Sequence, residues 1–219
     1  MSDERSQISM AAFVALSKQY FDDKDIKNIV EIGSLNGVDS LFLKGCYPES
    51  NVFCIEGLPD NYNNFLKDLT TITPINAVVA NYDGYIQYHY KDVNGIHGIL
   101  DRGQRYGSKT LDLPCYTMKT ICKKYNISSI DFVKIDVEGA TYEILNSMAD
   151  VLKTVKIMHI ETESYPFFKN QKLHDVVADY LTKNLFTMID KTQVTIDGGL
   201  QHDSVWVNNI YLSNKKAEK

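Results

Sequence analysis

The sequence predicts a three-layer α/β protein, in which a mostly parallel sheet carries helices on both faces. Two observations support this prediction: from about residue 26 short β-branched runs alternate with helix-like stretches, and four of the runs end in a carboxylate. Such alternation is typical of parallel sheets whose crossover connections are helices. With 219 residues, 44% of them hydrophobic, the chain can bury a core of its own. We expect one domain over residues 1–219.

The elements follow from the apolar runs, taken in chain order. Residues 1–25 are predicted to form a short amphipathic, helical segment. The predicted strands lie at residues 28–32, 51–56, 72–79, 130–136, 155–161, 186–190 and 204–212. The predicted helices lie between the strands, at residues 37–46, 59–69, 117–126, 140–152 and 171–184. Asn208 and Asn209 fit the last buried strand imperfectly. Residues 214–219 are predicted to be a frayed, solvated tail.

Residues 80–116 interrupt the alternation and form a predicted insertion. In this segment "GYIQYHY" has the pattern of a strand, a glycine-bearing loop follows, and "LDLPCYT" is typical of an edge strand that tolerates Pro114. A long irregular insertion in a compact domain is often functional. We therefore expect this segment to contribute a loop to the binding site.

Charge and cysteine content exclude several classes of protein. The net charge of -5 and the sequence pI near 5.5 disfavour binding to nucleic acid or to an anionic membrane. The four cysteines lack the C-x-x-C spacing of a zinc or redox site, so we expect reduced thiols. No signal peptide and no apolar run of about 18 residues is present. These features predict a soluble, cytoplasmic protein.

Four predicted strands end in an acidic residue: Glu31, Glu56, Asp136 and Glu161. The carboxyl ends of parallel strands share one edge of the sheet, and open α/β sheets bind ligands outside that edge. Buried carboxylates without partners are costly, so solvent, backbone donors or a cationic ligand must offset them. The acidic edge therefore indicates a ligand that carries positive charge.

The loop after Glu31 carries Gly33 and Gly37, without the middle glycine that lets a backbone approach the pyrophosphate of a dinucleotide. An acidic residue before such a turn favours S-adenosylmethionine, which has an ammonium, a sulfonium and a ribose diol. Glu31 would orient the amino group, and Glu56 would accept both ribose hydroxyls. The predicted cofactor-binding residues are Glu31, Gly33, Ser34, Asn36, Gly37, Ser40, Glu56, Gly57, Asn76, Ala77 and Asp136. A glycine loop can also be a simple turn, and a carboxylate at Glu56 suits any adenosine ligand.

These residues carry a family likeness. The chain resembles class I S-adenosylmethionine-dependent methyltransferases, and more narrowly the FkbM-type family, in "VEIGSLNGVDSLF", "FCIEGLPDNYNNFLKDL", "INAVVANYDGYIQYH" and above all "IDFVKIDVEGATYEIL". It departs at Thr141, where the family usually has a second glutamate, and near Lys119, where it has an acid. The resemblance implies a Rossmann-like, seven-stranded sheet with a reversed last hairpin. It also implies methyl transfer to an oxygen of a small molecule or glycan, with S-adenosylhomocysteine as product.

Methyl transfer to oxygen is an in-line displacement, so the enzyme chiefly aligns the reactants, and a base helps when the acceptor is a hydroxyl. Lys134, Asp136 and Glu138 would project to one side if the chain stays extended. We expect Asp136 to face the sulfonium or acceptor, and Glu138 to bind the acceptor or take its proton. An acid before a helix also stabilises that helix, which is the alternative for Glu138.

The predicted insertion offers His97 as a second candidate base, and with Arg102 and Arg105 it would fold over the acceptor and exclude water. A divalent metal between Asp136 and Glu161 is not favoured, because two carboxylates are too few. Two other functions stay open. The chain could be an NAD-linked or other enzyme of adenosyl ligands, or a non-catalytic module that binds the nucleoside. The sequence leaves the acceptor and the assembly state undetermined.

Overall fold

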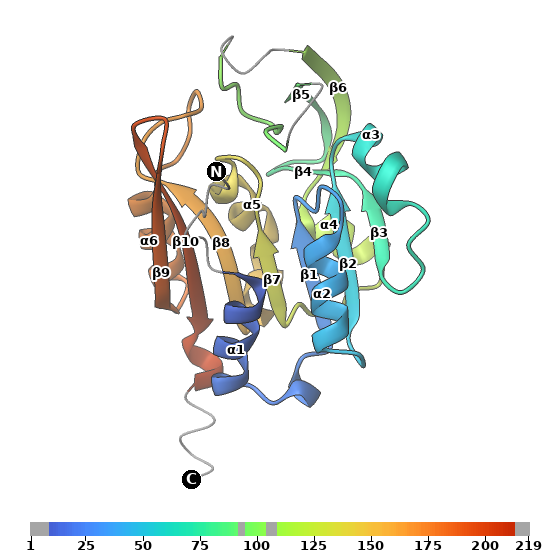
Figure 1. The fold of residues 1–219 in the computed structure, drawn as a ribbon, viewed down its shortest axis with the longest axis vertical. Helices are drawn as coiled ribbons and strands as arrows, with labels where there is room; N and C mark the ends of the chain where they lie inside the picture. The colour runs from blue at the N-terminus through green and yellow to red at the C-terminus, as the bar shows by residue number, and fades with distance from the viewer. Residues whose placement is uncertain (1–8, 92–94, 104–108, 213–219) are drawn as a thin grey trace, which may run out of the picture.

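Seven strands form the main sheet of this computed structural model, which describes residues 9–91, 95–103 and 109–212. The strands are β1 (Asn28–Ile32), β2 (Asn51–Glu56), β3 (Thr73–Asn76), β7 (Phe132–Ile135), β8 (Ile157–Glu163), β9 (Phe186–Ile196) and β10 (Gly199–Asn208). Their order is β3-β2-β1-β7-β8-β10-β9 (Figure 1). Strands β3, β2, β1, β7 and β8 pair in parallel, and β10 runs antiparallel to both of its neighbours.

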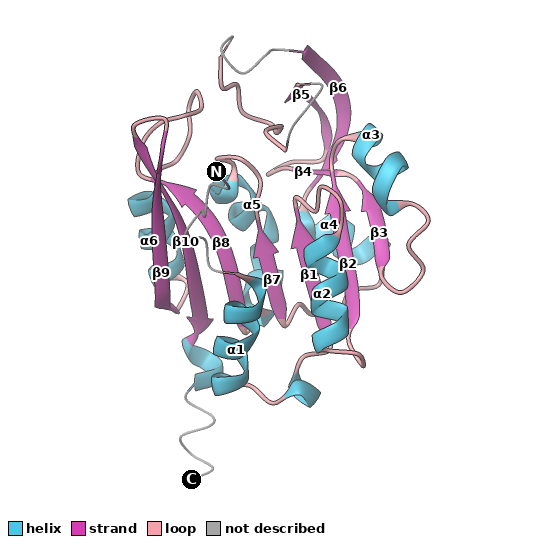
Figure 2. Ribbon diagram, in the orientation of Figure 1, coloured by secondary structure: helices cyan, strands magenta, loops and turns pink. Residues whose placement is uncertain are grey.

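Helices cover both faces of this sheet (Figure 2). On one face lie α1 (Met10–Tyr20) and α2 (Val38–Cys46), and on the other lie α4 (Met118–Lys124), α5 (Thr141–Met148) and α6 (His174–Lys183). Short turns complete the set: η1 (Asp23–Asp25), α3 (Pro59–Asn61), the π-helix η2 (Tyr62–Leu66) and the 3-10 helix η4 (Ala149–Thr154). No helix within the described ranges has the length and apolar character needed to cross a membrane.

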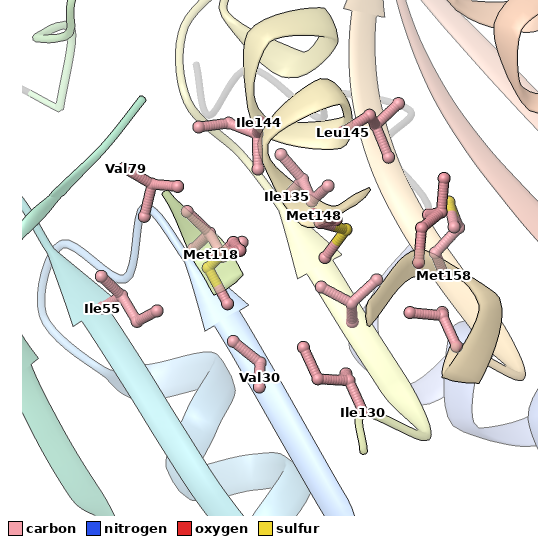
Figure 3. Packing of buried hydrophobic residues seen from close by; sticks show 14 of the residues in the cluster. Val30, Ile55, Val79, Met118, Ile130, Ile135, Ile144, Leu145, Met148 and Met158 are labelled. Carbon is pink, nitrogen blue, oxygen red and sulfur yellow. The ribbon is translucent and has the colours of Figure 1, made fainter. Parts of the chain in front are cut away.

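Strand alternation divides the core into two layers, one on each face. In β7, Phe132 packs against Phe13 of α1, with ring centroids 4.2 Å apart, whereas Val133 belongs to the cluster on the opposite face. Figure 3 shows that opposite cluster, in which Met118, Ile144 and Met148 lie over the strands. Because successive side chains of a strand point to opposite faces, a fully buried run such as "FVKI" supplies both layers.

The segment predicted as one strand at residues 72–79 belongs to two sheets, so that prediction was wrong in part. β3 pairs with β2 in the main sheet, and β4 (Val78–Val79) pairs with β6 (Lys109–Tyr116) in a second sheet. The backbone N–H of Ala77, between them, still donates to the carbonyl of Glu56, at 3.1 Å. The chain therefore passes from one sheet to the other across a single residue.

The predicted insertion forms a three-stranded sheet in the order β4-β6-β5, where β5 spans Gly84–Tyr90. The sequence predicted β6 as an edge strand because of Pro114, yet β6 lies in the middle of this sheet. The short β4 pairs only with Cys115 and Tyr116, however, so Pro114 itself has a neighbouring strand on one side alone. The proline is tolerated because β4 stops before reaching it.

The last two strands form a longer hairpin than the sequence indicated. β9 continues to Ile196, and β10 begins at Gly199, where 186–190 and 204–212 were predicted. Asp197 and Gly198 join them with φ values of 50° and 82°, which a two-residue hairpin turn requires. β10 ends at Asn208, whose buried amide donates to the carbonyl of Val155, and residues 209–212 are helical.

All four cysteines are free thiols, as the sequence predicted. Cys54, Cys115 and Cys122 are buried, and Cys46 is half-buried. Cys54 lies in β2 opposite Glu31 of β1. Burial raises the pKa of its thiol to about 12.

Candidate functional site

A cavity of about 240 Å³ lies at the carboxyl ends of β1, β2, β7 and β8. Gly33 follows β1, Gly57 follows β2, Asp136 follows β7, and Glu161 lies near the end of β8. The inserted sheet and its loop form the opposite wall, with Tyr88 and His97 among the lining residues. The cavity therefore lies where the sequence predicted a ligand site.

The loop after β1 packs so tightly that Gly33 has no room for a side chain. Its φ is +87°, and a Cβ there would lie 1.7 Å from the carbonyl oxygen of Asp136. Its backbone N–H donates to the carbonyl of Ile55, at 2.9 Å. Gly37 is also left-handed, with φ +74°, and a Cβ there would lie 2.7 Å from Leu66 Cδ2. Gly33 thus lets the loop fit between the ends of β2 and β7, and Gly37 lets it pack against Leu66 of η2.

Glu31 lies beneath this loop, where it meets a buried ammonium. Its carboxylate accepts a hydrogen bond from Ser40 Oγ and another from Lys134 Nζ, the latter at 3.2 Å. Lys134 Nζ also lies 2.7 Å from Asp39 and 3.3 Å from Asp136. Burial alone would lower the pKa of Lys134, but the charges of Asp136, Glu31 and Asp39 hold that pKa well above its usual value. Lys134 is therefore charged and shared by three acids.

Glu56 is fully buried at the end of β2 and is held by backbone donors. Its two oxygens accept hydrogen bonds from the N–H groups of Leu35, at 2.9 Å, and Leu58, at 2.8 Å. The Asn61 amide donates to it at 3.4 Å, and His97 Nε2 lies 3.8 Å from one oxygen. Burial raises the pKa of Glu56 to about 7, against the opposing effect of these donors. Glu56 thus titrates near neutral pH.

His97 lies beside Glu56 and is neutral. The Asn61 amide donates to its Nε2 at 3.0 Å, and its Nδ1 lies 2.7 Å from the hydroxyl of Tyr88. Because an amide nitrogen can only donate, these partners assign the proton to Nδ1. Burial lowers the pKa of His97 to about 4. The imidazole would have to leave Asn61 before Nε2 could take a proton.

The other end of the cavity is acidic. The chain leaves the strand after Ile135, and Glu138 has a φ of +50°, so the predicted extended alternation stops before it. Arg102 lies 3.7 Å from Glu138, which ties the insertion to this turn. Glu161 is 6% exposed, and its Oε1 has no hydrogen-bond partner within the described residues. Burial, reinforced by Asp136, raises the pKa of Glu161 well above its usual value.

Thr141 occupies the position at which the family that this chain resembles usually has a glutamate. Its hydroxyl donates to the carbonyl of Glu161 at 2.7 Å, and the side chain is buried. The threonine therefore fixes the start of α5 against β8. An uncharged donor suits this position, because several acids already surround Glu161.

The structure divides the predicted cofactor residues into those that line the cavity and those that support them. Gly33, Gly57, Ala77 and Asp136 line it, as do the candidate bases Glu138 and His97. The remaining residues do not line it. Glu31 and Ser40 bond to each other, and Ser34 donates to the carbonyl of Glu31. Glu56 accepts from the N–H groups of Leu35 and Leu58, and Asn76 donates to the carbonyl of Glu56. Asn36 accepts from the N–H of Val38, and Gly37 caps α2.

Sequence reasoning missed Tyr88 and Gln201, which also line the cavity. Tyr88 lies in the strand-like run "GYIQYHY" and could have been suspected from its place in the insertion. Gln201 lies in the last hairpin, and no local sequence pattern marked it as a site residue. Arg105 and the tail at 214–219 lie outside the described residues. Within the described ranges, no group of three or more His, Cys, Asp or Glu side chains is arranged to hold a metal ion.

The strand order and the glycine loop after β1 define the class I methyltransferase fold. A family model, the methyltransferase FkbM domain, matches residues 31–188, and the chain belongs to that family. None of the curated proteins compared with this chain matches it. The family match runs from Glu31 in β1 to the first residues of β9, and so includes the cavity-lining residues described above except Gln201.

Solved structures share the fold at low sequence identity. TrmK of M. capricolum, in complex with its natural cofactor product S-adenosylhomocysteine, has a TM-score of 0.51 and 12% identity, over 90% of this chain and 68% of that chain. The N-terminal domain of EvdMO1 with S-adenosylhomocysteine bound has a TM-score of 0.51 and 12% identity. The match covers 91% of this chain and 81% of that chain. An uncharacterized protein from Listeria monocytogenes serotype 4b has a TM-score of 0.48 and 13% identity. That match covers 90% of this chain but only 66% of the Listeria chain.

Proposed function

We propose that this methyltransferase moves the methyl group of S-adenosylmethionine to a hydroxyl group of a small molecule or sugar, releasing S-adenosylhomocysteine. The observation that carries the proposal is the placement of the Gly33 turn, the end of β2 and Asp136 around one cavity. The Gly33 turn suits the methionine part of the donor, and the end of β2 suits its ribose. Asp136 suits its sulfonium. An acidic edge favours a donor with two positive charges over a dinucleotide with two phosphates.

The residues take complementary roles in this proposal. The Gly33 loop closes around the donor, and the ammonium of Lys134 fixes Glu31 and Asp136 in place. Glu138 takes the proton of the acceptor hydroxyl while the acceptor oxygen displaces sulfur from the methyl group. His97 is the second candidate base. Glu138 is the better one, because His97 would have to break its bond to Asn61 before Nε2 could take a proton.

Glu56 provides the first test, because we propose that it accepts the ribose hydroxyls. It lies behind Leu35 and His97, so the ribose reaches it only if these residues shift. A hydrogen bond to a charged group contributes about 1.5–3 kcal/mol. Replacement of Glu56 by Gln is therefore expected to lower the affinity for S-adenosylhomocysteine by roughly ten- to a hundredfold. Isothermal titration calorimetry measures this, with the exposed Glu49→Gln as the control.

The same titration has a predicted pH dependence. Since the pKa of Glu56 is raised to about 7 in the folded protein, the carboxylate is mostly protonated at pH 6 and mostly ionised at pH 8. The ionised form accepts from both hydroxyls through stronger, charge-assisted hydrogen bonds. Affinity for S-adenosylhomocysteine should rise several-fold between these pH values, and the rise should disappear in Glu56→Gln. Binding of NAD in place of S-adenosylhomocysteine would overturn the proposal.

The acceptor class and the cellular location rest on the sequence. The net charge of -5 supports an acceptor other than nucleic acid, and the four free thiols favour a cytoplasmic location. A non-catalytic binding module would bind S-adenosylhomocysteine equally well. Loss of methyl transfer in Asp136→Ala and Glu138→Ala, with cofactor affinity retained in Glu138→Ala, distinguishes the enzyme from that alternative.

A further inference from the structure

A second cavity adjoins the first at the acidic end. Its volume is about 390 Å³, and it shares Glu138 and Gln201 with the first cavity. Arg102, Glu163, Phe167 and Phe168 form much of its remaining wall. A space of this size accommodates a molecule the size of a monosaccharide. If the first cavity holds the methyl donor, the second is the place from which an acceptor reaches the methyl group.

Two buried acids of one strand face this junction. Glu161 and Glu163 alternate along β8, so both side chains point to the same face of the sheet. Glu161 lines the first cavity and Glu163 lines the second. Glu161 Oε1 has no hydrogen-bond partner among the described residues, while Glu163 accepts a hydrogen bond from the Gln171 amide. Burial raises the pKa of both carboxyl groups.

Two nearby cations, Arg102 and Lys134, form their ion pairs with other acids. Arg102 lies 3.7 Å from Glu138 and 3.4 Å from Asp197, and its guanidinium stacks over the rings of Phe167 and Phe168. Lys134 lies between Glu31, Asp39 and Asp136. Neither Glu161 nor Glu163 forms an ion pair with a residue in the described ranges. Without a cation, burial therefore favours the neutral form of both carboxyl groups, and a bound cation would stabilise their ionised form.

A metal ion is a poor candidate for that cation, because the described residues offer no group of three ligand side chains. The sulfonium of the donor is also insufficient, since its proposed partner Asp136 lies in the first cavity and Glu163 lines only the second. A protonated amine fits better: it is compact, donates three hydrogen bonds, and needs only two or three oxygen partners.

We infer that the methyl acceptor carries a protonated primary amine beside its reacting hydroxyl, as amino sugars and amino alcohols do, and that Glu161 and Glu163 bind this ammonium. The inference rests on the proposed function. It also accounts for transfer to oxygen, because an ammonium nitrogen has no lone pair with which to attack the methyl group. The hydroxyl oxygen forms the new bond to carbon, the sulfur–carbon bond breaks, and the hydroxyl proton passes to Glu138.

Matched pairs of amine and neutral ligands test the inference. The protein is first saturated with S-adenosylhomocysteine, and the affinities of D-glucosamine and N-acetyl-D-glucosamine are then measured at pH 7, followed by those of 3-amino-1-propanol and 1,3-propanediol. We expect the amine to bind at least tenfold more tightly in one or both pairs. Glu161→Gln and Glu163→Gln should each reduce that preference at least fivefold, and the exposed Glu49→Gln should leave it unchanged.

The outcomes separate this inference from the proposed function. If S-adenosylhomocysteine fails to bind, the proposed function fails before any acceptor is added. If it binds but both members of each pair bind equally, or if the preference survives both glutamine variants, the cationic subsite is wrong while the cofactor assignment stands. Thermal unfolding of each variant confirms that it is folded, and glutamine is an isosteric, uncharged replacement at these buried positions.

Discussion

Replacement of Gly33 by alanine is expected to lower the free energy of unfolding by about 4 kcal/mol and to abolish binding of S-adenosylhomocysteine. The added Cβ would lie 1.7 Å from the carbonyl oxygen of Asp136, and the left-handed φ of +87° is itself unfavourable for alanine. Backbone strain of this kind costs about 1–3 kcal/mol, and overpacking adds a similar amount. Relief of the clash requires the loop after β1 to separate from the end of β7, which widens the cavity.

Gly45 provides the matched control for this substitution. It lies in α2, a few residues after the loop, and a Cβ there meets nothing within 4 Å. Since alanine favours a helix over glycine by up to about 1 kcal/mol, Gly45→Ala should keep or raise the stability. Urea unfolding followed by circular dichroism compares the two variants. If Gly33→Ala unfolds at the same urea concentration as Gly45→Ala, the close contact between the two strand ends is wrong.

Replacement of Lys134 by methionine should be almost as damaging. Lys134 is 6% exposed and lies within 3.3 Å of Glu31, Asp39 and Asp136. Removal of one partner from a buried ion pair costs about 3–5 kcal/mol, because the remaining charge is left uncompensated. Methionine keeps much of the length of the side chain, so loss of packing contributes little. We expect the unfolding free energy to fall by about 3 kcal/mol at pH 8.

The pH dependence of this loss identifies its cause. Burial raises the folded-state pKa of Glu31 above its unfolded value, and the loss of Lys134 raises it further. A carboxyl group with a raised folded pKa stabilises the fold when it is protonated, and that contribution disappears as the pH rises through the folded pKa. The deficit of Lys134→Met should therefore be smaller at pH 5 than at pH 8.

Two further variants complete the comparison for Lys134. The exposed Lys123→Met in α4 should change stability by less than about 0.5 kcal/mol. Glu31→Leu combined with Lys134→Met removes the most deeply buried acid of the group and should recover part of the loss. A Lys134→Met protein as stable as the parent at pH 8 would refute the assignment of Lys134 as the shared partner of these acids.

The layers of the fold were readable in the sequence because local and tertiary signals agree there. "NIVEI" and "NVFCIE" are apolar runs bounded by polar or glycine-bearing turns, and the bounds of β1 and β2 match the predicted 28–32 and 51–56. The acids that end these strands also lie at the expected edge of the sheet. The identity of the neighbouring strand, in contrast, depends on pairing between distant segments, which a single sequence does not encode locally.

The misplaced elements illustrate that limit. Nothing in "ITPINAVV" marks Ala77 as the residue at which the chain changes sheets, because both halves are equally suited to a strand. The turn at Asp197 and Gly198 did have a local signal, since Asp-Gly between β-forming runs is typical of a hairpin. The predicted strands at residues 186–190 and 204–212 both stop short of this turn, whereas β9 and β10 reach it.

For the candidate site, the sequence predicted which edge of the sheet carries the acids, but it did not predict where the side chain of each acid points. Glu31, Glu56 and Asp136 all lie at the ends of predicted strands, yet of these only Asp136 lines the cavity. Glu31 instead meets Lys134, and Glu56 is enclosed by backbone donors. Burial and partners of this kind arise from the packing of α2 and the insertion against the sheet. Tyr88 and Gln201 reach the cavity from segments far apart in the chain, and only the fold brings them together.

The buried thiol of Cys54 has a consequence for an enzyme that handles an alkylating agent. A methyl sulfonium reacts readily with thiolates, and Cys54 lies in β2 directly opposite Glu31 and two residues before Glu56. Because burial raises the pKa of this thiol to about 12, its sulfur stays protonated and poorly nucleophilic at physiological pH. Its burial and its neutral state both make this thiol a poor methyl acceptor.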